Sequence, residues 1–309
     1  MNGSLYRRSQ AAGDCASERG TALGKAESAA VRQATELPAL GSGLGYRRVH
    51  RGELFLDRRG IDFLEIVADH FMSADPAVQS ELALLQAHFP LIPHGLDLSL
   101  GSAEGLDPAY LDRLARVVEA IDPPWWSEHI AYTHADGVAI GHLAALPLTR
   151  EALDVLCANV RTAQTRIPAP LILENITTPF RLPGDELTEP QFLTELTERT
   201  GCGLLLDVTN LLVNAANLGF DPAEYLDQLP LERVVQTHYV GWARRGDTWV
   251  DDHGSETPEP VWELLAEVAT RCPLRGMVLE RDRNIPTLAA LRPELERARE
   301  IGRKAGRWD

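Results

Sequence analysis

The sequence predicts an α/β fold, a (β/α)8 barrel of the triosephosphate isomerase (TIM) type. From Gly41 onward, short apolar runs of strand length alternate with amphipathic stretches of helix length. Eight such runs occur, and the 309-residue chain is 44% hydrophobic, which is enough for a large core. A doubly wound sheet is the rival arrangement. The expected strands are residues 43–47, 61–68, 90–100, 125–133, 170–177, 203–210, 234–241 and 276–282.

Helices are expected between several of these strands and after the last one, at residues 107–121, 149–164, 188–200, 257–271 and 287–305. Several begin with Asp or Thr followed by Pro, which is typical of a helix start. Residues 1–40 are rich in Ala, Gly, Ser, Arg and Glu and show no sustained apolar period. We therefore expect a flexible, disordered N-terminal extension over 1–40 and one catalytic barrel domain over 41–309.

Composition restricts the compartment and the partners. The formal net charge is −15, with 45 acidic against 30 basic side chains, so nucleic acid is not an expected partner. The four cysteines, Cys15, Cys157, Cys202 and Cys272, form no C-x-x-C pair, which favours a reducing cytoplasm. No apolar run approaches the roughly 20 residues that span a bilayer, and the N-terminus has no signal-peptide core, so a cytoplasmic protein without membrane contact is expected.

Polar side chains interrupt the expected strands near their carboxyl ends. Strands of a parallel sheet are covered on both faces and should be almost purely apolar. Six of them nevertheless carry charged or imidazole groups, and two more such groups follow the seventh strand. In a barrel all carboxyl ends meet at one mouth, so these side chains should converge. They are His94, Glu128, His129, Glu174, Asp207, His238 and Glu280, followed by Asp251 and His253.

A metal cluster is the expected reason for this convergence. An unpaired buried ion costs on the order of several kcal/mol, and the strands bring almost no Lys or Arg apart from Arg281. Adjacent strand residues face opposite sides, so Glu128 is expected either to support His129 or to face the helices, rather than to bind metal. The expected ligands suit two or three ions, and donors without thiolate suit iron, zinc or manganese. These ligands are His94, His129, Glu174, Asp207, His238, Asp251, His253 and Glu280.

The same segments resemble a known family. "HGLDLSLGS", "SEHIAYT", "LILENITTP", "LLLDVTNLLVNAANLGFDP", "THYVGW", "DDHGSETPEPVW" and "LERDRNIP" are similar, in this order, to motifs of the multinuclear non-heme iron-dependent oxidative enzymes, formerly domain of unknown function family 692. The resemblance runs from about Gly41 to the C-terminus. It implies two or three iron ions in mixed Fe2+/Fe3+ states and dioxygen as co-substrate. The implied substrate is a residue, often Cys, in a ribosomally synthesised precursor peptide that a small partner protein recruits, as in methanobactin and thiaglutamate biosynthesis.

The resemblance also implies roles for individual residues. His94, His129 and Glu174 would hold one side of the cluster, and Glu174 would bridge to an ion shared with Asp207 and His238. Asp251, His253 and Glu280 would complete it. Three more residues are assigned to the catalytic site: Asn210 in "DVTN", where many members have "DVNN", Asp282 in "ERD", and His70 in "ADHF", where many members have "ENY". This last difference leaves the substrate subgroup open, including whether a C-terminal Asp is the modified residue.

Two other functions use similar side chains. A zinc or manganese barrel of the endonuclease IV or xylose isomerase type would need a basic DNA track or a catalytic Lys at a strand end, and the sequence favours neither. A metal-storage or scaffold protein would hold the same ions without consuming oxygen. Oxygen uptake and metal identity separate the three.

Overall fold

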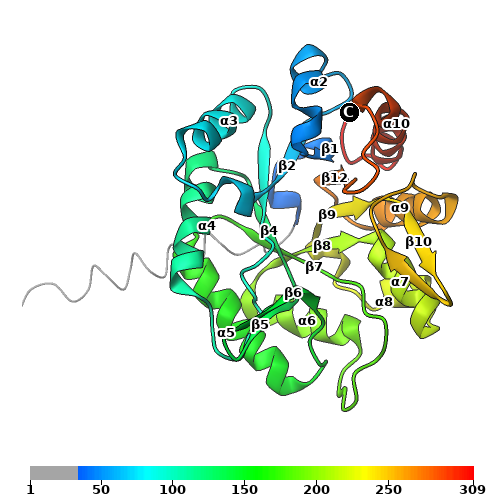
Figure 1. Cartoon of the computed structure of the whole chain (residues 1–309). Coiled ribbons are helices and arrows are strands. Elements are labelled where there is room, and N and C mark those ends of the chain that lie inside the picture. Colours follow the sequence, from blue (N-terminus) through cyan, green and yellow to red (C-terminus); the bar gives the residue numbers. More distant parts are fainter. Residues whose placement is uncertain (1–33) are drawn as a thin grey trace, which may run out of the picture.

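The computed structural model describes residues 34–309, and a closed barrel of parallel strands forms its centre (Figure 1). The order around the barrel is β1, β12, β9, β8, β7, β4, β3 and β2. Their bounds are Gly41–Gly45 for β1, Phe63–Val67 for β2, Leu91–His94 for β3, Trp126–His129 for β4, Leu171–Glu174 for β7, Gly203–Asp207 for β8, Val234–Tyr239 for β9 and Gly276–Leu279 for β12. The predicted (β/α)8 barrel is confirmed, and the doubly wound sheet is excluded.

The helices surround the barrel (Figure 1). They are α2 (Arg51–Leu56), α3 (Pro76–Gln86), α4 (Pro108–Ile121), α5 (Arg150–Arg166), α6 (Glu189–Thr200), α7 (Val208–Leu218), α8 (Pro222–Asp227), α9 (Glu259–Arg271) and α10 (Leu288–Lys304), with short 3-10 turns η1 (Ala34–Glu36), η2 (Arg48–His50), η3 (Ala68–Phe71) and η4 (Leu231–Arg233). All five expected helices are present. The strand expected over 203–210 ends at Asp207, because the Asp207 carboxylate accepts the Asn210 backbone N–H at 2.7 Å and so starts α7.

Two antiparallel hairpins follow barrel strands. The first pairs β5 (Tyr132–Ala135) with β6 (Val138–Ala144) after β4, so the strand expected over 125–133 is divided in two. The second pairs β10 (Trp242–Arg245) with β11 (Thr248–Asp251) after β9. Because both hairpins leave from carboxyl ends of barrel strands, they lie on the side of the barrel where active sites form.

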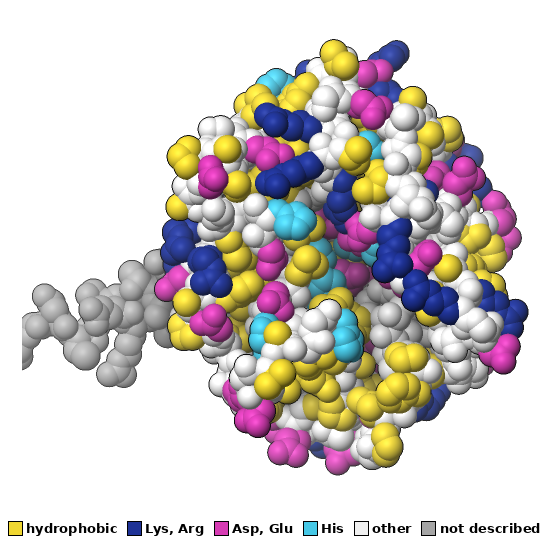
Figure 2. All heavy atoms as spheres, in the orientation of Figure 1, with side chains coloured by type: hydrophobic (Ala, Val, Ile, Leu, Met, Phe, Trp, Pro, Cys, Tyr) yellow, Lys and Arg dark blue, Asp and Glu magenta, His cyan; other side chains and the backbone are white. Residues whose placement is uncertain are grey.

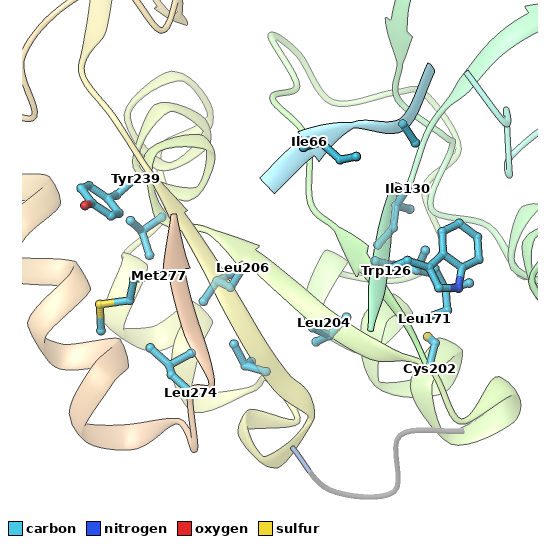
Figure 3. Packing of buried hydrophobic residues seen from close by; sticks show 14 of the residues in the cluster. Ile66, Trp126, Ile130, Leu171, Cys202, Leu204, Leu206, Tyr239, Leu274 and Met277 are labelled. Carbon is cyan, nitrogen blue, oxygen red and sulfur yellow. The ribbon is translucent and has the colours of Figure 1, made fainter. Parts of the chain in front are cut away.

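The outward side chains of the strands pack against the helices. Figure 3 shows Trp126, Leu171, Leu204 and Cys202 gathered on one side of the barrel, and Leu206, Leu274, Met277 and Tyr239 on another. Each of these side chains is at most 3% exposed. This layer closes the space between the sheet and the helices, as in other barrels of this class.

A separate apolar cluster fills the inside of the barrel at its amino-terminal end, and it is called the floor here. It consists of Phe63, Ile92, Trp125, Ile172, Leu205, Val235 and Val278, with Ala34 packed against them. A Cβ on Gly43 would lie 2.5 Å, and one on Gly276 2.8 Å, from the Phe63 ring, so glycine is required beside it. Any larger residue at either glycine position would therefore clash with the Phe63 ring.

The expected N-terminal extension is described only in part. Residues 1–33 lie outside the described residues, and residues 34–40 contact the barrel. Leu40 donates its backbone N–H to the Arg275 carbonyl at 2.6 Å, and Arg275 Nε donates to the Ala34 carbonyl at 2.9 Å. Within residues 34–309, no helix combines the length and the apolar character needed to cross a bilayer.

Candidate metal centre

The expected ligands stand directly above the floor. His94, Glu174, Asp207 and Glu280 each follow a floor residue by two positions, and alternate strand residues point to the same side. Each of these four side chains is at most 8% exposed. Figure 2 shows a hollow at the middle of this face, with acidic and histidine side chains at its bottom. The folding of the strands alone therefore brings these side chains into one layer.

Two imidazoles face one carboxylate. His94 Nε2 and His129 Nε2 each lie 3.5 Å from Glu174 Oε2. The other ring nitrogen of each is engaged from behind: Ser127 Oγ lies 2.8 Å from His94 Nδ1, and Glu128 Oε1 lies 3.2 Å from His129 Nδ1. Such partners fix the ring orientation and the tautomer of a histidine ligand. Glu128 thus supports His129, in the way the sequence predicts.

His238 is held in the same manner. Its Nδ1 lies 3.1 Å from Glu280 Oε2 and 3.5 Å from Glu174 Oε1, whereas its Nε2 lies 2.8 Å from Glu65 Oε1. Gln236 in turn donates from Nε2 to Glu65 Oε2 at 2.5 Å. Glu65 is not among the residues expected at this site. The rule that found Glu174 could have found it, because Glu65 also stands two residues after a floor residue.

His253 lies at the more open side of the cluster. Its Nδ1 is 3.2 Å from Asp282 Oδ2 and 3.7 Å from Glu280 Oε2, and its Nε2 is 2.5 Å from Asp251 Oδ2. Arg47 forms ion pairs with Glu280, at 3.2 Å, and with Asp282. Asp282, expected outside the ligand set, therefore lies among the donors, while Asp251 holds His253 through one carboxylate oxygen.

The donors fall into three groups that share members. Within each group, one ligand atom per residue lies within 4.8 Å of the others: His94, His129 and Glu174; Glu174, Asp207, His238 and Glu280; His253, Glu280 and Asp282. Glu174 and Glu280 each belong to two groups, so each could contribute to holding two ions. Asp251 is in none of the three.

Several buried polar atoms here have no hydrogen-bond partner. They are Glu174 Oε2, Asp207 Oδ2, Asn210 Oδ1, His238 Nδ1 and Asp251 Oδ1. A buried polar group without a partner costs about 1–3 kcal/mol, so such atoms rarely gather without a reason. All five can offer a lone pair to a metal ion, the imidazole and the carboxylates once they are deprotonated and the Asn210 amide oxygen without any proton loss. The residues present therefore fit divalent metal ions.

The imidazoles differ in charge state. Burial, followed by the neighbouring His129, lowers the pKa of His94 to about 3. Burial opposes a charge on His129 as well, but Glu174, Glu128 and Glu280 together outweigh it and raise the pKa of His129 to about 9. Glu65 and Glu174 likewise outweigh burial at His238 and hold its pKa well above the usual value. Glu280 and Asp251 do the same for the pKa of His253. Without metal, protons on these three imidazoles therefore offset part of the charge of the carboxylates.

The carboxylates also differ from one another in the direction of their pKa shifts. Burial and the nearby Asp251 raise the pKa of Asp207 well above its usual value. Burial opposes the ionisation of Glu280, but His253 and His238 outweigh it and hold the pKa of Glu280 well below its usual value. Because metal ligands must be deprotonated, an ion that enters this cluster has to release the protons held there.

The three residues assigned to catalysis have different surroundings. Asn210 is buried, donates from Nδ2 to the Asn175 carbonyl at 3.0 Å and directs its unpartnered Oδ1 into the protein. Asp282 lies beside His253. His70 is exposed in η3, and in the part of the chain that the structure describes no hydrogen bond or ion pair joins it to the cluster. The structure thus brings Asn210 and Asp282 together with the ligand layer, whereas His70 is exposed and is influenced by the charges of Arg47 and Asp282.

Comparison with known proteins supports the family assignment. A sequence model of the RiPP precursor modification enzymes MbnB/TglH/ChrH, in which RiPP denotes a ribosomally synthesised and post-translationally modified peptide, matches residues 41–303. A UPF0276 protein of Streptomyces avermitilis is 40% identical over 91% of this chain, which spans only 58% of that relative. A UPF0276 protein of Caulobacter vibrioides is 38% identical over 85% of this chain and 94% of its own length.

Solved structures show the fold alone. Endonuclease IV from Thermus thermophilus superposes with a TM-score of 0.52 at 17% identity, covering 86% of this chain and 99% of its own. A xylose isomerase domain protein from Planctomyces limnophilus gives a TM-score of 0.53 at 14% identity over 88% and 99% of the two chains. The family model that matches residues 41–303, together with the two UPF0276 proteins, confirms the resemblance seen in the sequence. The chain belongs to the MbnB/TglH/ChrH family of RiPP precursor modification enzymes.

Proposed function

We propose that this protein uses iron and dioxygen to oxidise one residue, a Cys or a C-terminal Asp, of a ribosomally synthesised precursor peptide that a small partner protein recruits. One observation carries this proposal. Three imidazoles, each held from behind by Ser127, Glu128 or Glu65, direct their other nitrogen toward carboxylates that have unpartnered oxygens. Membership of a peptide-modifying family supplies the substrate class.

The proposed ligands are the three donor groups, with Asp251 and Asn210 completing the set. Two or three iron ions, in mixed Fe2+ and Fe3+ states, would be held by these side chains. Bound iron would supply the redox chemistry with dioxygen. In the overall reaction, electrons leave the peptide residue and dioxygen, the oxidant, takes them up.

The chain's own residues would prepare this site. The apolar floor closes the barrel beneath the ligands, which excludes water from one side and leaves the mouth for the peptide. Glu65, Ser127 and Glu128 orient the histidine rings so that each presents one nitrogen. Arg47 offsets part of the negative charge of Glu280 and Asp282. His70, exposed after β2, is proposed to contact the incoming peptide.

The protein's own cysteines, as far as the structure describes them, are free thiols, which suits the proposed cytoplasmic location. The described cysteines, Cys157, Cys202 and Cys272, are free and buried. Burial raises the pKa of Cys202 and Cys272 to about 12, which keeps both as unreactive thiols. They are therefore proposed to be structural, so the oxidised thiol would belong to the peptide.

A zinc or manganese hydrolase or isomerase is the alternative, because the nitrogen and oxygen donors would also hold those ions. The deciding test uses protein purified without oxygen, the precursor peptide and the partner protein encoded beside it. We expect iron in the protein, oxygen uptake that requires the peptide, and a change in peptide mass. Glu174→Gln should abolish all three, whereas the same change at the exposed Glu263 on α9 should leave them intact. Zinc or manganese alone with no oxygen uptake would instead favour the alternative.

A further inference from the structure

A cavity of about 620 Å³ lies on the outer side of β4 and β7, next to the metal centre. Ile130, which directly follows His129, and Ile176, two residues after Glu174, form part of its wall. Leu146 and Phe220 line it from the segment after β6 and from the turn between α7 and α8. Figure 2 shows hydrophobic side chains gathered along the lower edge of the hollow, on the side of α6. The volume lies within the range of small-molecule and side-chain binding sites.

The polar lining of this cavity is acidic. Arg181 is its one cationic side chain, against five carboxylates: Asp185, Glu186, Glu189, Asp221 and Glu224. Three of the five are engaged with the backbone, because Asp185 accepts the Leu148 N–H at 2.9 Å, Glu186 the Arg150 N–H at 2.9 Å and Asp221 the Ala223 N–H at 2.8 Å. Neither Glu189 nor Glu224 forms an ion pair with any cation among residues 34–309. Two carboxylates thus remain available to a ligand.

A buried hydroxyl marks the polar end of the cavity. Tyr225 is 5% exposed, stacks on Phe220 and has no hydrogen-bond partner of normal geometry for its hydroxyl, which lies near the Glu189 carboxyl. Burial raises the pKa of Glu189 to about 7. A buried hydroxyl without a well-aligned hydrogen bond is costly, and a ligand that donates to it would remove that cost.

The shape and the charge of the cavity suit one kind of ligand. Apolar walls accept an aliphatic stem, and a carboxylate with a hydroxyl at the end accepts a cationic head, so the combination matches the side chain of Lys or Arg. An acidic side chain would meet like charge, and a purely apolar one would leave the Tyr225 hydroxyl without a well-aligned partner. The position beside His129 and Glu174 places such a side chain close to the proposed reaction centre.

We propose that this cavity binds a Lys or Arg side chain of the precursor peptide and so anchors the peptide beside the metal centre. The identity of the ligand as a peptide residue rests on the proposed function. The binding chemistry itself rests on Glu189, Tyr225 and the apolar wall, and needs no metal.

Binding is therefore tested on chelated, metal-free protein. The probes are the Nα-acetyl amides of lysine, arginine, norleucine and glutamate, followed by ligand-detected NMR. We expect the two cationic probes to bind more tightly than norleucine, and glutamate to bind least. Glu189→Gln should weaken the cationic probes about tenfold and leave norleucine unchanged. Glu198→Gln, the same change at an exposed site on the same helix, should have no effect. Equal binding of all probes, or equal losses in the two variants, would overturn the proposal.

Steady-state kinetics with the precursor peptide test whether the cavity anchors it. Replacing the anchoring basic residue of the precursor peptide by norleucine should raise KM about tenfold with little change in kcat, and Glu189→Gln should do the same with the unchanged peptide. Tyr225→Phe, which keeps the ring, should give a smaller rise. An unchanged KM in all three cases would refute the anchor even though the enzyme is active. If no iron-dependent turnover occurs at all, the proposed function fails, and the probe measurements still decide whether the cavity binds cations.

Discussion

The floor and the mouth of the barrel are built by the same strands, yet they hold opposite kinds of side chain. Ile92, Ile172, Leu205 and Val278 lie in the apolar floor, and two positions later the same strands present His94, Glu174, Asp207 and Glu280. Two residues of a parallel strand rise about 6.6 Å. Within that distance the interior changes from a layer that stabilises the fold to a layer that binds ions.

This contrast separates the two tasks of the barrel interior. Floor residues are buried, pack mainly through apolar contacts and contribute free energy of folding. The mouth residues carry charges, unpartnered atoms and shifted pKa values, so they contribute little to stability without metal. Changes in the floor should therefore affect unfolding, and changes in the mouth should affect metal binding.

The largest effect is expected in the floor. Phe63→Ala removes the ring that covers Gly43 and Gly276 and leaves a cavity that the strands cannot close. We expect a loss of about 3–5 kcal/mol in the free energy of unfolding, measured in urea on metal-free protein. Phe180→Ala is the control, because that ring is 60% exposed and should matter by less than about 0.5 kcal/mol. Similar small losses in both variants would contradict the role of the floor.

Glu174→Gln should have the largest effect at the mouth. Glu174 faces His94, His129 and His238, and it belongs to two donor groups. Its replacement should weaken metal binding at least about 100-fold, measured by competition with a chelator, while the metal-free protein stays folded. Wild-type metal affinity in this variant would mean that the ions lie elsewhere.

Glu65 tests the link between the two layers. Trp125 of the floor donates from Nε1 to Gln236 Oε1 at 2.9 Å, and Gln236 contacts Glu65, which holds His238. Glu65→Ala should lower metal affinity about 10- to 100-fold, and Glu65→Gln, which keeps an oxygen acceptor, should restore part of it. The same chelator competition measures both. If the two variants lose affinity equally, the hydrogen bond to His238 is not the reason.

The smallest expected effect lies outside the barrel, at Glu189. Its pKa in the folded protein is about 7, against an ordinary value of 4.5. Between these values the folded state keeps a proton that the unfolded state gives up, so Glu189 makes stability fall as pH rises from 4.5 to 7. Glu189→Gln should flatten that slope in melting curves recorded with chelator. Glu198→Gln should keep it, and identical slopes in all three proteins would show that Glu189 is not desolvated.

The sequence predicted much of this site, because isolated polar residues in apolar strands are easy to recognise. Asp207 in "LLLDVTN" and Glu174 in "LILENIT" stand out against aliphatic neighbours. Glu65 was not predicted, although it is the fifth residue of the expected strand 61–68, the position that Glu174 holds in 170–177, so the sequence carried the same signal at both. The role of Arg47 could not be predicted, because its partner Asp282 is 235 positions away in the sequence and no local spacing connects them.

Other features depend on tertiary structure. Asp207 is both the last residue of β8 and the cap of α7. Because no loop separates the two elements, the sequence resembles one longer strand over 203–210. The β10–β11 hairpin pairs outside the barrel sheet, and its turn at Gly246, with a φ of +63°, is the only local signal of it in "RRGD". The cavity beside β4 and β7 is formed by segments from four parts of the chain, which no local pattern brings together.

Anomalous diffraction at the iron edge, on crystals of protein prepared without oxygen, tests the central claim most directly. We predict two or three iron peaks among the donor groups, one of them between Glu174 and the rings of His94 and His129. Data recorded on both sides of the zinc edge should show no zinc at these positions. Zinc alone in the mouth, or no metal next to Glu174, would contradict the assignment of this layer as an oxidative iron centre.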